Sequence, residues 1–151
     1  MPFDHKDPNF KTRVQESFSK QKLMHTMGAN IATIEAGHVV LEMPFSESFT
    51  QQHGFLHAGT VTTMMDSAAG YAAFSLMPPQ AEVLTIELKT NLISPARGEF
   101  FRFEGNVIKP GRTITFCEAT AYALDASGSQ KKIATMAATM MSVVDQKGVN
   151  R

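Results

Sequence analysis

The sequence has one cysteine and no tryptophan, and its charges of the two signs are equal in number. Because Cys117 stands alone, the chain can form no internal disulfide, and it contains no zinc motif of cysteines. Proteins of this kind are typical of a reducing compartment. We therefore predict a cytoplasmic protein whose structure depends on no disulfide and on no metal ion.

Two further absences narrow the function. Fourteen basic residues balance fourteen acidic ones, so the chain lacks the positive field that draws most proteins to nucleic acid. No stretch approaches the roughly 20 apolar residues that a membrane-spanning helix needs, and residues 1–20 contain no apolar core of a signal peptide. We expect neither nucleic acid nor a membrane as a partner.

What the chain does have is enough apolar material for one core. Of its 151 residues, 43% are hydrophobic and 19% are charged, and this composition is typical of one folded domain. We predict a single domain over residues 1–151, with an N-terminal helix at about residues 8–27, a core at about 28–145 and a polar tail at 146–151. The helix is indicated by apolar residues at roughly helical spacing.

Apolar and polar residues alternate in six segments, which is the pattern of β-strands with one buried face. Residues 31–35 and 38–44 flank Ala36-Gly37 and form a predicted hairpin. Four more segments follow, separated by turns that contain proline, glycine or aspartate; they are residues 83–93, 99–108, 113–124 and 132–144. Turns about every dozen residues favour an antiparallel meander.

Within residues 83–93 the alternation sorts the side chains between two faces of the strand. One face receives the apolar side chains, which are Leu84, Ile86, Leu88 and Leu92. The other face receives the polar side chains, which are Thr85, Glu87, Lys89 and Asn91. We therefore expect Thr85 to share its face with two charged residues.

The longest uninterrupted segment runs from Leu56 to about Met77, 22 residues without proline. Its apolar residues recur at steps of three and four and cover most of the circumference, so the segment is predicted to be a buried helix. Pro78-Pro79 ends it. With strands before and after the helix, the arrangement with the fewest alternatives is α+β, one antiparallel sheet curled around one long central helix.

One acid, Asp66, lies among the alanines and methionines of this helix. A lone carboxylate in an apolar helix costs free energy unless it is paired or used. The preceding segment, residues 51–59, contains two glycines and brings His57 and unbonded backbone N–H groups to the start of the helix. Together the acid and the turn indicate a functional site on this helix.

Four motifs occur in a specific order: the loop 54–59, Asp66 nine residues after His57, the strand end 93–96 and the hairpin 110–113. In this order and spacing they resemble the PaaI-like (phenylacetic acid degradation) group of hotdog-fold thioesterases over about residues 30–143. The resemblance implies the hotdog fold, an antiparallel sheet wrapped around one long central helix, here with an added N-terminal helix. Two positions depart from the group's pattern: Gln51 replaces a usual asparagine and Ala58 a usual glycine.

The resemblance implies an acyl-CoA thioesterase, which hydrolyses a thioester to a free acid and CoA without a metal ion or an organic cofactor. Hydrolysis builds negative charge on the carbonyl oxygen, and backbone N–H groups at a helix start stabilise such charge. Ala58 and Gly59 are the candidate donors, with the Gln51 amide as a third. His57 would shape the turn, and Asp66 would activate water or attack the carbonyl directly. Thr85 matches a family position that helps to orient the water.

The expected partner is a small-molecule acyl-CoA. Candidates for contact with the substrate are Gly54, Phe55 and Met65. An apolar tunnel lined by Phe55, Met64, Met65 and Phe74 would suit medium-chain or aryl acids. Candidates for contact with the CoA phosphates are Lys89, Arg97, Lys109 and Arg112. The simpler interpretation of the last two, a solvated hairpin, stays open.

His57 and Asp66 cannot serve one carbonyl within one chain. Nine residues turn a helix by about 900° and advance it by about 13 Å, so the two residues lie on nearly opposite sides and far apart. If both act on one substrate, they come from two subunits, which requires a twofold homodimer with two sites. Whether two dimers associate further into a homotetramer stays open.

Other interpretations remain at this point. His57 serves equally well as a structural residue that bonds the loop backbone. Cys117 has no histidine beside it in the sequence and is more simply a packed thiol than a nucleophile. The alternative function is a non-catalytic acyl-CoA-binding module on the same fold, against which Asp66 argues, and a hotdog hydratase would need a different local motif.

Overall fold

The computed structural model describes residues 3–144, and the predicted tail at 146–151 lies outside them. Its helices are α1 (Phe10–Ser19), α2 (Lys22–Thr26) and α3 (Ala58–Phe74), with a short 3-10 helix, η1 (Glu47–Phe49). Its strands are β1 (Asn30–Glu35), β2 (His38–Pro44), β3 (Glu82–Leu92), β4 (Phe100–Lys109), β5 (Ile114–Leu124) and β6 (Gln130–Val143). The predicted order of helices and strands is confirmed.

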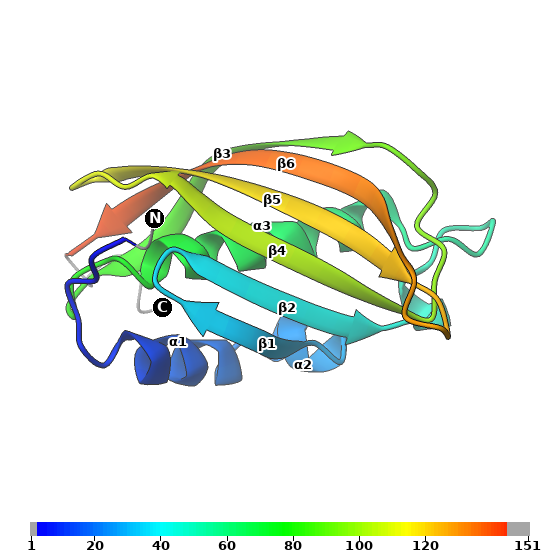
Figure 1. Ribbon diagram of the computed structural model, residues 1–151, viewed down its shortest axis with the longest axis horizontal. Coiled ribbons are helices and arrows are strands. Elements are labelled where there is room, and N and C mark those ends of the chain that lie inside the picture. Colours follow the sequence, from blue (N-terminus) through cyan, green and yellow to red (C-terminus); the bar gives the residue numbers. More distant parts are fainter. Residues whose placement is uncertain (1–2, 145–151) are drawn as a thin grey trace.

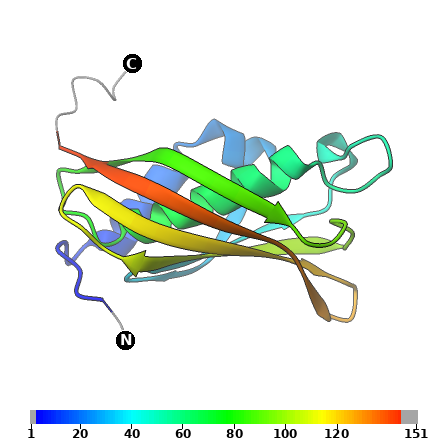
Figure 2. The same cartoon turned by 90° about the horizontal axis from the view of Figure 1, so that it is seen from above.

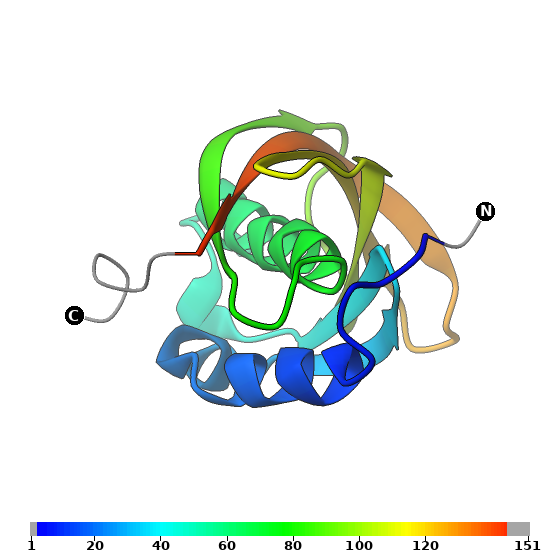
Figure 3. The same ribbon diagram turned by 90° about the vertical axis from the view of Figure 1, so that its left-hand side faces the viewer.

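The six strands form one sheet in the order β1-β2-β4-β5-β6-β3, and every neighbouring pair is antiparallel. The sheet curls around α3, which runs along its concave side (Figure 1, Figure 3). β3 is the last strand on one side, next to β6, as Figure 2 shows from above. The predicted α+β architecture is therefore present, and β3 is a free edge of the sheet.

The centre of the core is α3, ten of whose residues between Val61 and Phe74 are buried. Its surface is apolar nearly all round, so it can contact the sheet and α1 at the same time. Close approach to the sheet depends on Gly105 of β4, because a side chain there would collide with the backbone of Ala68. The large side chains of Met64 and Met65 are fully buried.

The N-terminal helix predicted at about residues 8–27 is in fact two helices. Gln21 has extended backbone angles (φ −79°, ψ 102°) and separates α1 from α2. α1 packs against the far end of α3, where the rings of Phe18 and Tyr71 lie 5.9 Å apart. Arg13 donates hydrogen bonds to the carbonyls of Phe74 (2.9 Å), Met77, Pro78 and Ala81. It thereby satisfies carbonyls at the helix end.

The central helix is shorter at both ends than its predicted span from Leu56 to about Met77. At the start, the N–H of Leu56 donates to the carbonyl of Ala96 (3.1 Å), which holds Leu56 outside the helix. At the end, α3 stops at Phe74, and a looser turn continues to Met77. Among residues 3–144, no helix is long and apolar enough to cross a membrane.

Candidate active site

The lone acid of the central helix has a specific partner. Asp66 is partly buried on α3, and its Oδ1 accepts a hydrogen bond of 2.7 Å from the hydroxyl of Thr85 on β3. The Thr85 hydroxyl also lies 3.4 Å from the sulfur of Met140. Within residues 3–144, no side chain donates a hydrogen bond to Oδ2 of Asp66.

A β-bulge brings Thr85 to the acid. The pairing of β3 with β6 shifts between Thr85 and Glu87, so Ile86 is an extra residue. Thr85 is opposite Met140, whose side chain is fully buried, whereas Glu87 accepts a hydrogen bond from Thr139 on the outer face. The prediction that Thr85 shares a face with Glu87 and Lys89 is therefore wrong, because strict alternation fails at a bulge.

Asp66 and Thr85 line a hollow of about 330 Å³, which we call the acid hollow. α3 contributes Asp66, Gly70 and Tyr71 to it, β3 contributes Thr85, and the N-terminal helical segment contributes Ser17 and Gln21. No lysine or arginine lines it, and a second acid, Glu82, does. The acid hollow is thus lined by two carboxylates, and its other lining residues are neutral.

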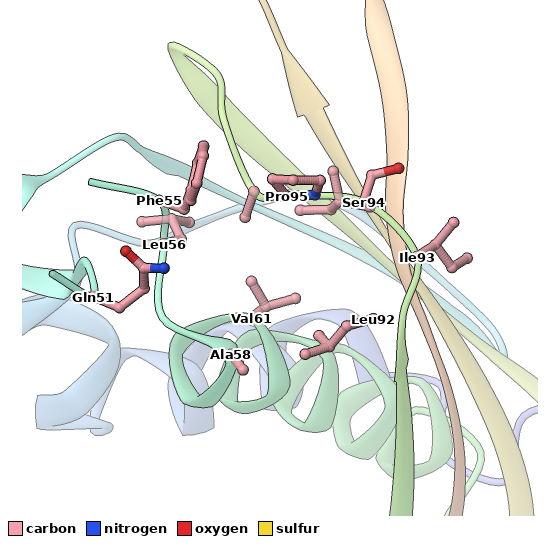
Figure 4. Close-up of a pocket in the computed structure, with 11 residues that line it drawn as sticks. Gln51, Phe55, Leu56, Ala58, Val61, Leu92, Ile93, Ser94 and Pro95 are labelled. Carbon is pink, nitrogen blue, oxygen red and sulfur yellow. The ribbon is translucent and has the colours of Figure 1, made fainter. Parts of the chain in front are cut away.

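A second hollow, of about 400 Å³, lies at the start of α3, and we call it the amide hollow. Its lining includes Gln51, Phe55, Ala58, Leu92 and Pro95 (Figure 4). Figure 4 shows the Gln51 amide nitrogen on the side that faces the hollow, while Oε1 of Gln51 accepts the N–H of His53. The amide hollow and the acid hollow share no lining residue.

The first turn of α3 presents one backbone N–H group to the amide hollow. His57 is the N-cap, and its Nδ1 accepts the N–H of Gly59 at 2.8 Å. The N–H groups of Thr60 and Val61 donate to the carbonyl of His57. The Ala58 N–H has no acceptor within residues 3–144. Ala58 is therefore the open donor, whereas the N–H of Gly59, the other predicted donor, is engaged by His57.

Of the three predicted substrate-contact residues, Phe55 lines the amide hollow, whereas Gly54 and Met65 do not. The guanidinium of Arg97, one of the predicted phosphate-binding cations, lies 5.1 Å from the centre of the Phe55 ring. Gly54 has φ +85°, a left-handed conformation that favours glycine, so it shapes the turn. Met65 is fully buried in the core and lines neither hollow, because it lies on the side of α3 that packs inside the protein.

Three of the predicted phosphate-binding cations, Lys89, Lys109 and Arg112, do not line the amide hollow of their own chain. Lys89 pairs with Ala137 across the β3–β6 ladder and is exposed. Lys109 ends β4, and Arg112 lines a third hollow of about 270 Å³ with Met77 and Pro78, beyond the end of α3. In one chain, Arg112 is therefore at the opposite end of α3 from Ala58.

Two other chemistries would need a reactive thiol or a cluster of metal ligands. Burial raises the pKa of the Cys117 thiol to about 12, so this group stays protonated and packed in the core. Within residues 3–144, no three histidine, cysteine, aspartate or glutamate side chains gather as a metal site.

The chain is similar to several known proteins. Residues 53–128 match the model of the thioesterase superfamily. A protein of Saccharolobus solfataricus classed as an esterase is 31% identical over 106 residues, which is 70% of this chain and 75% of that protein. A 1,4-dihydroxy-2-naphthoyl-CoA hydrolase of Listeria monocytogenes is 24% identical over 96 residues, 64% of this chain and 78% of that protein.

Among solved structures, a thioesterase family protein from Silicibacter pomeroyi has a TM-score of 0.88 and 52% identity, and the match covers 90% of this chain and 99% of that one. The Escherichia coli PaaI protein of the phenylacetic acid degradation operon has a TM-score of 0.79 at 13% identity, with 89% and 94% covered. At that identity the second likeness concerns the fold.

Proposed function

This chain belongs to the thioesterase superfamily, with the predicted hotdog fold, and is a thioester hydrolase; from that premise we propose that it hydrolyses acyl-CoA at sites shared between two subunits. The observation that carries the proposal is the separation of the two hollows. The carbonyl-polarising donors line one hollow and the acid lines the other, with no lining residue in common. A complete site needs the amide hollow of one subunit and the acid hollow of its partner.

The free edge of β3 supports the twofold dimer. This strand has 11 residues, and Ile86 and Leu92 are 52% and 59% exposed. Proteins usually protect such an edge with charge, bulges or a covering segment, because its unpaired N–H and C=O groups invite another strand. Antiparallel pairing of two β3 strands about Glu87 or Leu88 sets Thr85 of one subunit opposite residues 89–91 of the other. Those residues adjoin Leu92, which lines the amide hollow.

In such a dimer each group has a defined part in the reaction. The Ala58 N–H and the Gln51 amide donate to the thioester oxygen and stabilise the charge that develops on it. From the partner, Asp66, held by Thr85, takes a proton from water as the water oxygen adds to the carbonyl carbon. The C–S bond then breaks, and the CoA sulfur takes up that proton. Direct attack by the carboxylate would give the same products through an anhydride.

The cations fit the CoA arm only in the dimer. Antiparallel association places the end of one α3 near the start of the other, so Arg112 and Lys109 of one subunit approach the amide hollow of its partner. There they would meet phosphate oxygens at the surface. We include in this proposal that the enzyme needs no metal ion or organic cofactor and that it works in the cytoplasm.

The test is a panel of acyl-CoA substrates, with release of free thiol as the readout. Wild-type protein is expected to release CoA, and Asp66→Asn to lower kcat by at least about 100-fold while the Tm is unchanged, because a carboxamide cannot accept the proton. Glu118→Gln, an exposed carboxylate on β5, is the matched control and should retain full activity. Binding of acyl-CoA without thiol release would identify a binding module instead.

A further inference from the structure

One helical turn beyond the acid, α3 carries a glycine that the backbone does not require. Gly70 is buried, yet a Cβ at this position would meet no atom within 4 Å. It has no positive φ, and a glycine in a helix interior is less favourable than alanine. Asp66 and Gly70 lie four residues apart, on one face of the helix, and both line the acid hollow. The missing side chain therefore leaves space beside the acid.

Beyond Gly70, the acid hollow is lined by a hydrogen-bonded wall of Ser17, Gln21 and Tyr71. Gln21 donates from Nε2 to the hydroxyl of Tyr71 at 2.8 Å, and the hydroxyl of Ser17 lies 3.3 Å from the same oxygen. Burial raises the pKa of Tyr71, so the phenol stays protonated. Ser17 and Gln21 of the wall come from the N-terminal helical segment, and Tyr71 comes from α3, five residues or about 7.5 Å along the helix past Asp66.

The charges decide which part of the substrate enters. Asp66 and Glu82 line the acid hollow with no lysine or arginine, so the phosphates of CoA are disfavoured there. At the amide hollow, Arg97 lies over Phe55. The CoA arm therefore leaves by the amide hollow, and the acyl group enters the acid hollow of the partner subunit.

We propose that the space at Gly70, closed by Gln21 and Tyr71, holds the far end of the acyl group, and that Gly70 thereby sets the size of the acyl group. This inference rests on the proposed function. The acyl group has its carbonyl beside Asp66 and ends at the wall, so the substrates are compact and uncharged, an aromatic ring or a short chain. Long fatty acyl chains are excluded by the wall.

The experiment compares kcat/KM for acetyl-CoA, benzoyl-CoA and octanoyl-CoA in two variants that change the space in opposite directions. Gly70→Ala adds one methyl group to the hollow; kcat/KM for benzoyl-CoA should fall at least about tenfold and that for acetyl-CoA by less than about twofold. The Tm should stay the same or rise, because alanine favours the helix. Gln21→Ala removes part of the wall and should raise kcat/KM for octanoyl-CoA about tenfold.

The outcomes separate the two proposals. Opposite shifts in acyl preference by the two variants support the role of Gly70 and its wall. Equal changes for all three substrates overturn it while the thioesterase proposal stands. If wild-type protein hydrolyses none of the three, both proposals fail. Gln21→Ala decides the question on its own if Gly70→Ala does not fold, since the Gln21 side chain caps no helix.

Discussion

The start and the middle of α3 contrast in how their polar groups are held. At the start, the contacts are local: His57 caps Gly59, and Gln51 accepts from His53, in each case two residues along the chain. In the middle, the contacts span the fold: Thr85 donates to Asp66 across 19 residues. The side-chain contacts beside the neutral donors are thus local, and the contact that holds the acid is long-range.

The two hollows cannot form one site within a single chain, because their polar groups lie too far apart along α3. Ala58 and Asp66 are eight residues apart, about 12 Å along the helix axis. A thioester carbonyl must be in hydrogen-bond contact with a donor and within reach of the acid at once. The comparison therefore predicts that activity belongs to the pair of subunits, and two experiments test this prediction.

The largest effect is expected from mixing two inactive variants. Ala58→Pro removes the N–H from the amide hollow, and proline is accepted at the first position of a helix; we expect at least about a 100-fold loss of kcat. Asp66→Asn removes the acid from the other hollow. Subunit exchange between them gives heterodimers with one intact site. At equal mixing, about half of the dimers are of this kind, so activity should return to about a quarter of wild type.

The controls for mixing are each variant taken alone through the same exchange, which should stay inactive. Exchange is followed by mass spectrometry of the intact dimers, so that the fraction of heterodimer is known. If heterodimers form and activity stays at the level of the single variants, both halves of the site lie in one subunit and the comparison fails.

A charge on the free edge of β3 should have the next largest effect. Ile86 is 52% exposed and lines neither hollow. Ile86→Lys places a charge where a second β3 strand would pair, and such charges block edge pairing. We expect a monomer by light scattering and a fall in kcat/KM of at least about tenfold. The matched control is Ile108→Lys on β4, which is 57% exposed away from this edge. A monomer with full activity would contradict the shared site.

The same contrast between local and long-range contacts decides what the sequence could predict. Order and type of the strands, the central helix and the turn at Gly54 follow from patterns within a few residues, and the structure agrees with them. The side of β3 on which Thr85 lies depends on the pairing of β3 with β6, which the alternation of apolar and polar residues does not reveal. The break between α1 and α2 at Gln21 is likewise not visible in the sequence pattern. The burial of Met65 depends on which side of the largely apolar central helix meets the core.

The smallest predicted effect concerns His57, for which the sequence leaves a structural and a catalytic interpretation open. His57 is the N-cap of α3, so His57→Ala should lower the free energy of unfolding by about 1 kcal/mol, measured by urea denaturation. His57→Asn supplies another side chain that caps a helix well, so the stability should return to that of wild type.

Because the imidazole is engaged by Gly59, we expect kcat in the asparagine variant to stay within about tenfold of wild type. A stable asparagine variant with kcat lowered more than about 100-fold would instead show that the imidazole moves protons, since general acid–base groups contribute on that scale. The start of α3 would then hold a reacting group of its own, and the contrast with its middle would no longer be one of neutral donors against an acid.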